Sequence, residues 1–182
     1  MKLSEVSDYP QLVEFWCSIY KKMQHNFAKN SERRRFYFCN SYWDLQNFMQ
    51  GMNVRMSPCV IMESNLEGEI EQFAYDKQSF TIHFCVRSTD AGDGHANRDA
   101  KKEAKEHMRN FLNWLNRLQH DKRRCPKFLR RMDFSDIEYK TQAPFYDGWV
   151  AVYLTIHLPE QYNICVVEDE YVDGMLFGEE DE

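Results

Sequence analysis

The feature that most limits how this chain can fold is a long amphipathic stripe between about residues 100 and 118. Six small or apolar side chains recur there three or four positions apart: Ala100, Ala104, Met108, Phe111, Leu115 and Leu118. Lysine, arginine and asparagine occupy the opposite side, which predicts a helix with one buried face and one face in solvent. The rest of the chain must supply the surface that covers the buried face.

Two strongly alternating segments can form part of that surface. In Ser79–Arg87, every second side chain is apolar and the ones between are more polar. The apolar residues are Phe80, Ile82, Phe84 and Val86. In 149–158 the apolar face again repeats every second residue: Val150, Val152, Leu154, Ile156 and Leu158. The opposite face of this second strand carries Trp149, Tyr153 and His157, large amphipathic side chains that need solvent, a covering element or a partner.

Weaker patterns predict three more extended segments: 58–63, 72–75 and 132–140. A turn near Gly68 would separate the first two, and a hairpin across 143–148 would pair the third with the strand that follows it. Phe36–Cys39 is a short apolar run, which fits either a brief strand or a loop anchor.

Two shorter helices are predicted near the N-terminus. Apolar residues recur at helical spacing from Tyr9 to about Asn26, with Ser7 or Asp8 as the N-cap, and a second helix follows Ser41. We therefore expect an α+β fold. It would be a small, mostly antiparallel sheet packed on one long amphipathic helix, with extra N-terminal helices and an acidic C-terminal tail.

Composition limits the domain organisation and the class of partner. The chain has 182 residues and 43% hydrophobic content, enough to bury the core of one ordinary domain. We expect an N-terminal helix in residues 1–30, a core domain in 31–167 and the acidic tail in 168–182. The net charge of -6 argues against a general affinity for nucleic acid. Scattered single cysteines, and the lack of a signal peptide or long apolar stretch, predict a soluble chain in a reducing cytoplasm.

Motifs that would indicate catalysis or a bound cofactor do not occur. The loop DAGDGHAN fails as a phosphate-binding loop because no Lys-Ser/Thr pair follows Gly94, and as a calcium loop because the last carboxylate position falls on Ala100. His83 and His157 could begin a metal pair if their strands were neighbours, but no third ligand is in view. Without an H-E-x-x-H or G-x-S-x-G motif, we expect no enzymatic activity, no metal and no cofactor.

Charged runs suggest contacts between copies of the chain. Basic residues cluster in three runs: Arg33, Arg34 and Arg35; Arg123 and Arg124; Arg130 and Arg131. The tail begins with three carboxylates: Glu168, Asp169 and Glu170. The basic runs can grip phosphates or pair with carboxylates of an adjacent copy. Because its like charges repel, we expect the tail to become ordered only against a basic surface of a neighbour.

The segment from about Ser41 to Tyr162 resembles the tail terminator and head-to-tail joining family, small α+β proteins that form rings at the neck and tail end of tailed bacteriophages. The resemblance lies in element order and local pattern and covers roughly two thirds of the chain. Five stretches carry it in order: PCVIMES, SFTIHFCVRS, TDAGDG, AKKEAKEHMRNFLNWLNRL and MDFSDIEYKTQAPFYDGWVAVYLTIHL. No catalytic signature is among them.

The resemblance implies a virion structural protein, made in the host cytoplasm, that forms a homo-oligomeric ring of six or twelve subunits. Its neighbours would be portal, connector or tail-tube proteins, with no membrane and no sequence-specific nucleic acid as partners. In such a ring Trp149, Tyr153 and His157 become contact residues, as do the arginine run 33–35 and the acidic run 168–170. Alternatively, the N-terminal helix covers the aromatic face within one chain. The second functional hypothesis is a non-enzymatic intracellular binding or regulatory module with a pocket between sheet and long helix.

Overall fold

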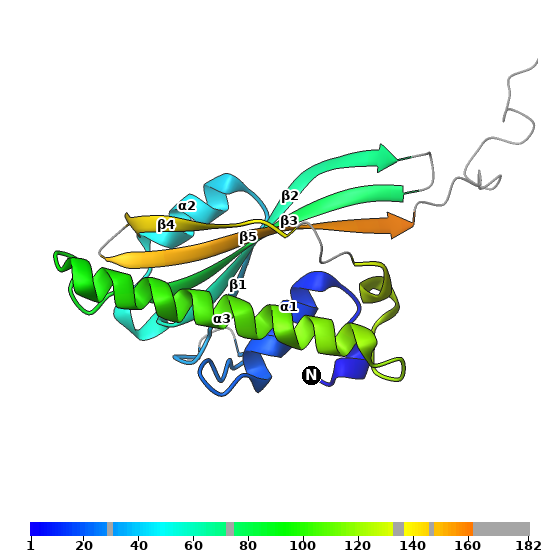
Figure 1. Ribbon diagram of the computed structural model, residues 1–182, viewed down its shortest axis with the longest axis horizontal. Helices are drawn as coiled ribbons and strands as arrows, with labels where there is room; N and C mark the ends of the chain where they lie inside the picture. The colour runs from blue at the N-terminus through cyan, green and yellow to red at the C-terminus, as the bar shows by residue number, and fades with distance from the viewer. Residues whose placement is uncertain (29–30, 72–74, 133–136, 146–147, 162–182) are drawn as a thin grey trace, which may run out of the picture.

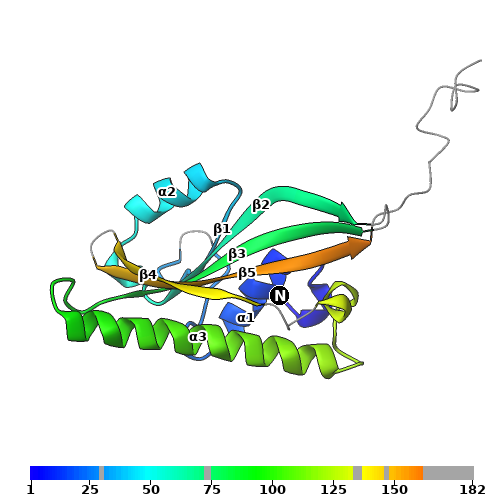
Figure 2. The same cartoon turned by 45° about the horizontal axis from the view of Figure 1, so that its top comes forward.

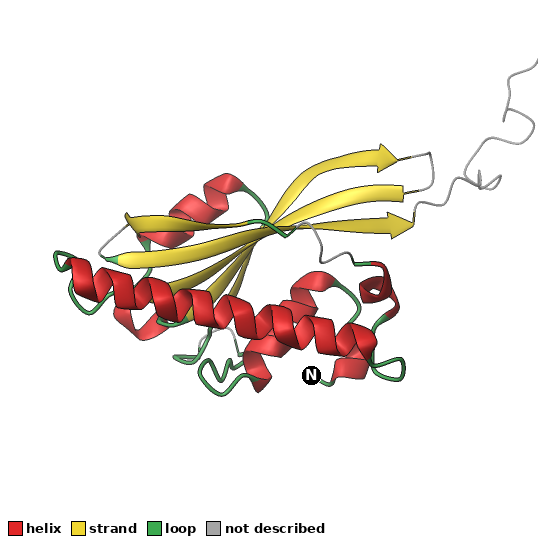
Figure 3. Cartoon of the chain, viewed as in Figure 1, coloured by secondary structure: helices red, strands yellow, loops and turns green. Residues whose placement is uncertain are grey.

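The computed structural model describes residues 1–28, 31–71, 75–132, 137–145 and 148–161 (Figure 1). The helices and strands follow one another in the predicted order: α1 (Tyr9–Ile19), β1 (Phe36–Cys39), α2 (Tyr42–Gln50), β2 (Cys59–Glu71), β3 (Tyr75–Arg87), α3 (Gly94–His120), β4 (Tyr139–Phe145) and β5 (Trp149–Gln161). The fold is α+β, and its mostly antiparallel sheet packs on the long helix α3, as predicted (Figure 3).

The five strands lie in the order β1-β2-β3-β5-β4. Only β1 and β2 are parallel, and α2 makes the connection between them. The other neighbours are antiparallel, including the hairpin of β4 and β5 that the sequence predicts. The short apolar run 36–39 is thus a strand and not only a loop anchor.

Side-chain caps set where the helices begin. Asp8 caps α1 and accepts a hydrogen bond from the backbone of Gln11, while Ser41 caps α2. Asp93 caps α3 by accepting from two backbone N–H groups, so the helix starts inside the glycine-containing loop, at Gly94. The first helix is shorter than predicted, because it ends at Ile19 and not near Asn26.

One face of the sheet is closed by α1 and α3 together (Figure 2). All six residues of the predicted stripe on α3 are buried there. The ring of Trp16, on α1, lies 5.1 Å from that of Phe111 on α3 and 6.1 Å from that of Phe84 on β3. The N-terminal helix therefore shares one core with the sheet and packs on its own chain.

The other face is covered in part by α2. Leu45 and Met49 of α2 join a second buried cluster that contains Ile61, Cys85 and Trp149. Trp149 is 1% exposed, which corrects the picture of an exposed aromatic face at this position. The expectation that the N-terminal helix would be its intramolecular cover is also wrong, because α1 lies on the opposite face.

The strand boundaries differ from prediction in two places. Gly68 is not at a turn: it lies within β2, beside an irregularity in the pairing with β3 between Asn65 and Gly68. The weaker strand begins at Tyr139 and not near Met132, which follows the short 3₁₀ helix Lys127–Arg131. A glycine within a strand is ambiguous from sequence alone, because the same residue serves turns and bulges.

Candidate functional site

A concavity with several polar lining residues lies beside α2, where this short helix leaves part of the sheet uncovered. It has a volume of about 450 Å³. Its wall on the helix side is mainly apolar, whereas strands β2 to β5 supply polar groups. The lining residues are Leu45, Gln46, Met49, Glu63, Thr81, His83, Thr141, Gln142 and Tyr153.

His83 is the residue with the most unusual environment in this pocket. It is 7% exposed, and neither ring nitrogen has a hydrogen-bond partner among the described residues. The Glu63 carboxylate lies 3.7 Å from Nε2, too far for a hydrogen bond. Its ring lies beside that of Tyr153, with centroids 5.4 Å apart. A buried imidazole without partners costs free energy, so His83 is the group in this pocket that gains most from a hydrogen-bonding ligand or water.

The geometry of this pocket does not form a catalytic relay. A nucleophile needs a base within hydrogen-bonding reach, and His83 has no such contact with Thr81 or any other hydroxyl of the described residues. The lining contains one carboxylate, hydroxyls and amides but no lysine or arginine. The pocket can therefore accept hydrogen bonds from a polar or cationic group and can stack it on Tyr153.

The sequence-based idea of a metal pair is not supported by the strand register. His83 pairs with Tyr153, whereas His157 pairs with Ser79, four residues before His83 on β3. That offset places the two histidine backbones roughly 13 Å apart along the strands, too far for one ion. Within the described residues, no group of three or more His, Cys, Asp or Glu could hold a metal ion. The side chain of His157 is outside the described part of the structure.

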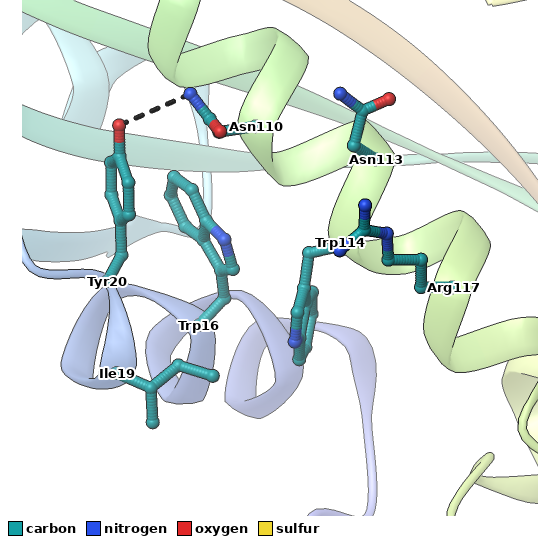
Figure 4. Close-up of a pocket in the computed structure, with 7 residues that line it drawn as sticks. All are labelled: Trp16, Ile19, Tyr20, Asn110, Asn113, Trp114 and Arg117. Atoms are coloured by element: carbon teal, nitrogen blue, oxygen red, sulfur yellow. Dashed lines mark hydrogen bonds between the residues drawn. The ribbon is translucent and has the colours of Figure 1, made fainter.

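A second concavity is a groove between α1 and α3. Two adjoining hollows of about 280 and 470 Å³ form it, and they share Ile19, Trp114 and Arg117. Figure 4 shows the side chains of Trp16 and Trp114 between the two helices, and a hydrogen bond from Asn110 to the Tyr20 hydroxyl. Burial raises the pKa of Tyr20, so this hydroxyl keeps its proton at neutral pH.

The space between the sheet and α3 is different. A hollow there measures only about 10 Å³, which is about the space of one water-sized probe. Its lining includes Leu12, Ile82 and Phe111. The pocket between sheet and long helix in the second functional hypothesis is thus filled by side chains. A binding module of this fold would have to use the pocket beside α2 or the groove between α1 and α3.

The arginine run 33–35 immediately precedes β1, and hydrogen bonds to His25 hold its backbone in place. The backbone N–H groups of Arg35 and Phe36 both donate to Nδ1 of the buried His25, whose Nε2 lies 3.0 Å from a Glu14 oxygen. Burial lowers the pKa of His25, so the ring is neutral and accepts these bonds at pH 7. Arg33 is exposed, and neighbouring Arg55 is also exposed, with Glu32 as its ion-pair partner at 3.3 Å.

The predicted contact residues therefore divide into three groups. Tyr153 lines a pocket and Arg33 lies on the surface, whereas Trp149 is a core residue that no second chain can reach unless α2 moves. The acidic residues 168–170 lie outside the described part of the chain. Sequence reasoning missed Glu63 as a site residue, and it treated His83 only as half of a metal pair. The signal for His83 was its polar position in the clearest strand of the chain.

No known protein family and no curated protein matches this sequence. In the described part of the chain, no helix combines the length and the apolar character needed to span a bilayer. What supports a function is therefore the geometry of the chain itself.

Proposed function

We propose that this chain is a non-enzymatic structural subunit of a tailed phage, forming a homo-oligomeric ring at the head-to-tail or tail-terminating junction. Its place would be the virion, beside portal, connector or tail-tube proteins. The resemblance in element order supports this proposal. The single observation that carries it is a sheet extension with a charge opposite to that of the other end of the subunit.

The extension, here called the arm, comprises residues 64–71, 75–79 and 157–161 of β2, β3 and β5. In Figures 1 and 2 these strand ends run past α2. The pairing of β1 with β2 stops at Glu63 and that of β4 with β5 stops at Leu154, so the described strands leave both edges of the arm unpaired. A projecting element of this kind offers two faces and two edges to a neighbour.

The arm is strongly acidic in sequence. It contains a single lysine, Lys77, and five carboxylic residues: Glu67, Glu69, Glu71, Asp76 and Glu160. Glutamates, a bulge near Gly68 and Pro159 are features that oppose open-ended strand pairing at a sheet edge. An arm protected in this way favours contact through charge over uncontrolled fibre growth.

The basic counterpart lies at the opposite end of the sheet. Because β1 and β2 are parallel and the Arg35 carbonyl accepts from the Val60 N–H, the arginines 33–35 and Arg55 lie near the start of β2. The arm is the far part of β2, and its tip at Glu71 lies roughly 36 Å along the strand from Val60 at about 3.3 Å per residue. Opposite charges on opposite ends fit a head-to-tail contact, which closes into a ring when the rotation between subunits is suitable.

The test is the assembly of the full chain and of matched charge variants. Native mass spectrometry and negative-stain images should show rings for the unchanged chain and monomers for Arg33→Glu/Arg55→Glu. The control Arg98→Glu/Arg109→Glu reverses two exposed charges elsewhere and should still form rings. Adding Glu69→Lys/Glu71→Lys to the first variant should restore assembly. A chain that stays monomeric at all concentrations and is absent from virions would overturn the proposal.

The second candidate is a small-molecule binding module. His83 in the pocket beside α2 favours it, because its ring nitrogens have no hydrogen-bond partner in the described part of the chain. A ligand that binds only the folded state raises the melting temperature of the protein. A thermal shift with nucleotides, amines or guanidinium compounds would support this candidate if Met49→Trp, which fills the pocket, abolished the shift. A ring subunit should respond to none of them.

A further inference from the structure

The groove between α1 and α3 has an apolar floor that is open to solvent. Ile19 at the end of α1 is 50% exposed, although it is a large aliphatic residue. Phe15 and Trp114 are only partly buried, with ring centroids 6.3 Å apart across the groove. Solvent-exposed apolar surface of this kind is a usual property of binding grooves.

The rim of the groove is cationic. Arg117 and Arg124 line it, and both are exposed. Arg117 has no ion-pair partner among the described residues, and Arg124 has only a contact of 3.8 Å with Asp121. The next basic residues, Lys122 and Arg123, are also exposed. An apolar floor with a basic rim is complementary to a segment that combines apolar side chains with carboxylates.

The C-terminal segment of this chain has that composition. Residues 168–182 contain no lysine or arginine. Two acidic clusters, 168–170 and 179–182, flank five apolar side chains: Tyr171, Val172, Met175, Leu176 and Phe177. Such a segment has more apolar area than a solvated acidic tail needs, and clusters of this kind are anchors in peptide recognition.

We propose that residues 168–182 dock in the α1–α3 groove of the same molecule, with the apolar residues 171–177 on the floor and the flanking carboxylates at Arg117 and Arg124. This placement replaces the expectation that the tail is ordered only by a neighbour, and it does not depend on ring formation. The docked tail covers Ile19 and neutralises the basic rim.

The direction of β5 favours this contact within one chain. Strand β5 and helix α3 run toward the same end of the molecule, which is the right-hand end in Figures 1 and 2. From Gln161 to Tyr171 the chain can span up to about 33 Å, because each extended residue adds about 3.3 Å. A tethered segment that can reach its site binds at a high effective concentration, so its own groove has the advantage over that of another copy.

Hydrogen exchange on the full chain tests the docking. In the unchanged protein the amides of 171–177 should exchange at least about tenfold more slowly than in Arg117→Glu/Arg124→Glu, a factor that corresponds to about 1.4 kcal/mol. Ile19→Asp should have the same effect. The matched controls are Arg98→Glu/Arg109→Glu for the charges and Val54→Asp for an exposed apolar residue outside the groove. Both controls should leave the protection unchanged.

Charge exchange and dilution separate the possible outcomes. Adding Glu179→Lys/Glu180→Lys to Arg117→Glu/Arg124→Glu should restore the protection, which a merely structural role of the arginines would not do. Protection should also survive about a hundredfold dilution, because intramolecular binding is independent of concentration. The proposal is overturned if 171–177 are unprotected in the unchanged chain, if the groove variants leave protection intact, or if dilution removes it and so assigns the tail to another copy.

Discussion

The two faces of the sheet are covered by helices to different degrees. On one face, α1 and the 27-residue α3 close the core, and a hollow between them and the sheet measures only about 10 Å³. On the other face, the nine-residue α2 covers only part of the strands and leaves a pocket of about 450 Å³. The difference shows where this fold holds its stability and where it keeps a surface that can change without loss of the core.

The boundary between core and pocket on the second face runs between two aromatic residues of β5. Trp149 is buried under α2, whereas Tyr153 lines the pocket. Truncation of Trp149 to Ala should lower the free energy of unfolding by about 3–5 kcal/mol, because a large cavity remains in a packed cluster. Tyr153→Ala should lower it by less than about 1.5 kcal/mol, as expected of a partly exposed site.

Urea unfolding of the two single variants measures this contrast. Equal losses for both would show that α2 does not set the boundary. Trp149→Phe sharpens the comparison. The Trp149 Nε1–H has no hydrogen-bond partner in the described structure, so removing it should offset part of the free energy that is lost with the smaller side chain.

The closed face should make stability depend on pH through His107. This side chain is fully buried on α3, its Nδ1 lies 3.1 Å from the Tyr20 hydroxyl, and burial lowers its pKa below the ordinary value of 6.5. The groups around it include Glu103 on its own helix and Lys22 after α1. Between the lowered pKa and 6.5 the unfolded chain binds more protons, so stability decreases as the pH falls through that range.

The expected slope for this histidine is at most about 1.4 kcal/mol per pH unit. Urea unfolding at pH 7.5, 6.5 and 5.5 measures it. His107→Gln should flatten the dependence, although His25, whose pKa burial also lowers, should retain a part. An unchanged slope in His107→Gln would show that this histidine is not the source.

The sequence predicted the closed face better than the open one, for a physical reason. A fully covered helix or strand repeats apolar residues at a fixed period, and the six stripe residues of α3 display that period. Partial cover leaves no such signature. Trp149 and Tyr153 lie on the same face of β5. Trp149 is nevertheless a core residue and Tyr153 lines the pocket, because burial on that face depends on how far α2 extends.

The candidate sites were harder to predict because they are made by distant segments. The pocket beside α2 unites Glu63 and His83 with Tyr153, and the groove unites Ile19 with Trp114. Neither pairing has a spacing in sequence that could be recognised. The order of the elements, by contrast, followed from local signals such as the caps Asp8 and Ser41.

One buried histidine on each face gives the smallest but most selective test of the comparison. Among the described residues, His107 on the closed face has Tyr20 as a hydrogen-bonding partner at Nδ1 and none at Nε2, whereas both ring nitrogens of His83 on the open face have none. Replacing His107 by Leu leaves the Tyr20 hydroxyl with one partner fewer and should cost about 1–3 kcal/mol. Replacing His83 by Leu removes two unsatisfied polar atoms from a buried position. It should therefore leave the unfolding free energy within about 1 kcal/mol of the unchanged chain, with the sign toward stabilisation. Paired urea titrations at pH 7.5 measure both changes under one condition. A loss at His83 as large as that at His107 would mean that His83 has a partner in solution, and the pocket would then be a filled polar core and no binding site.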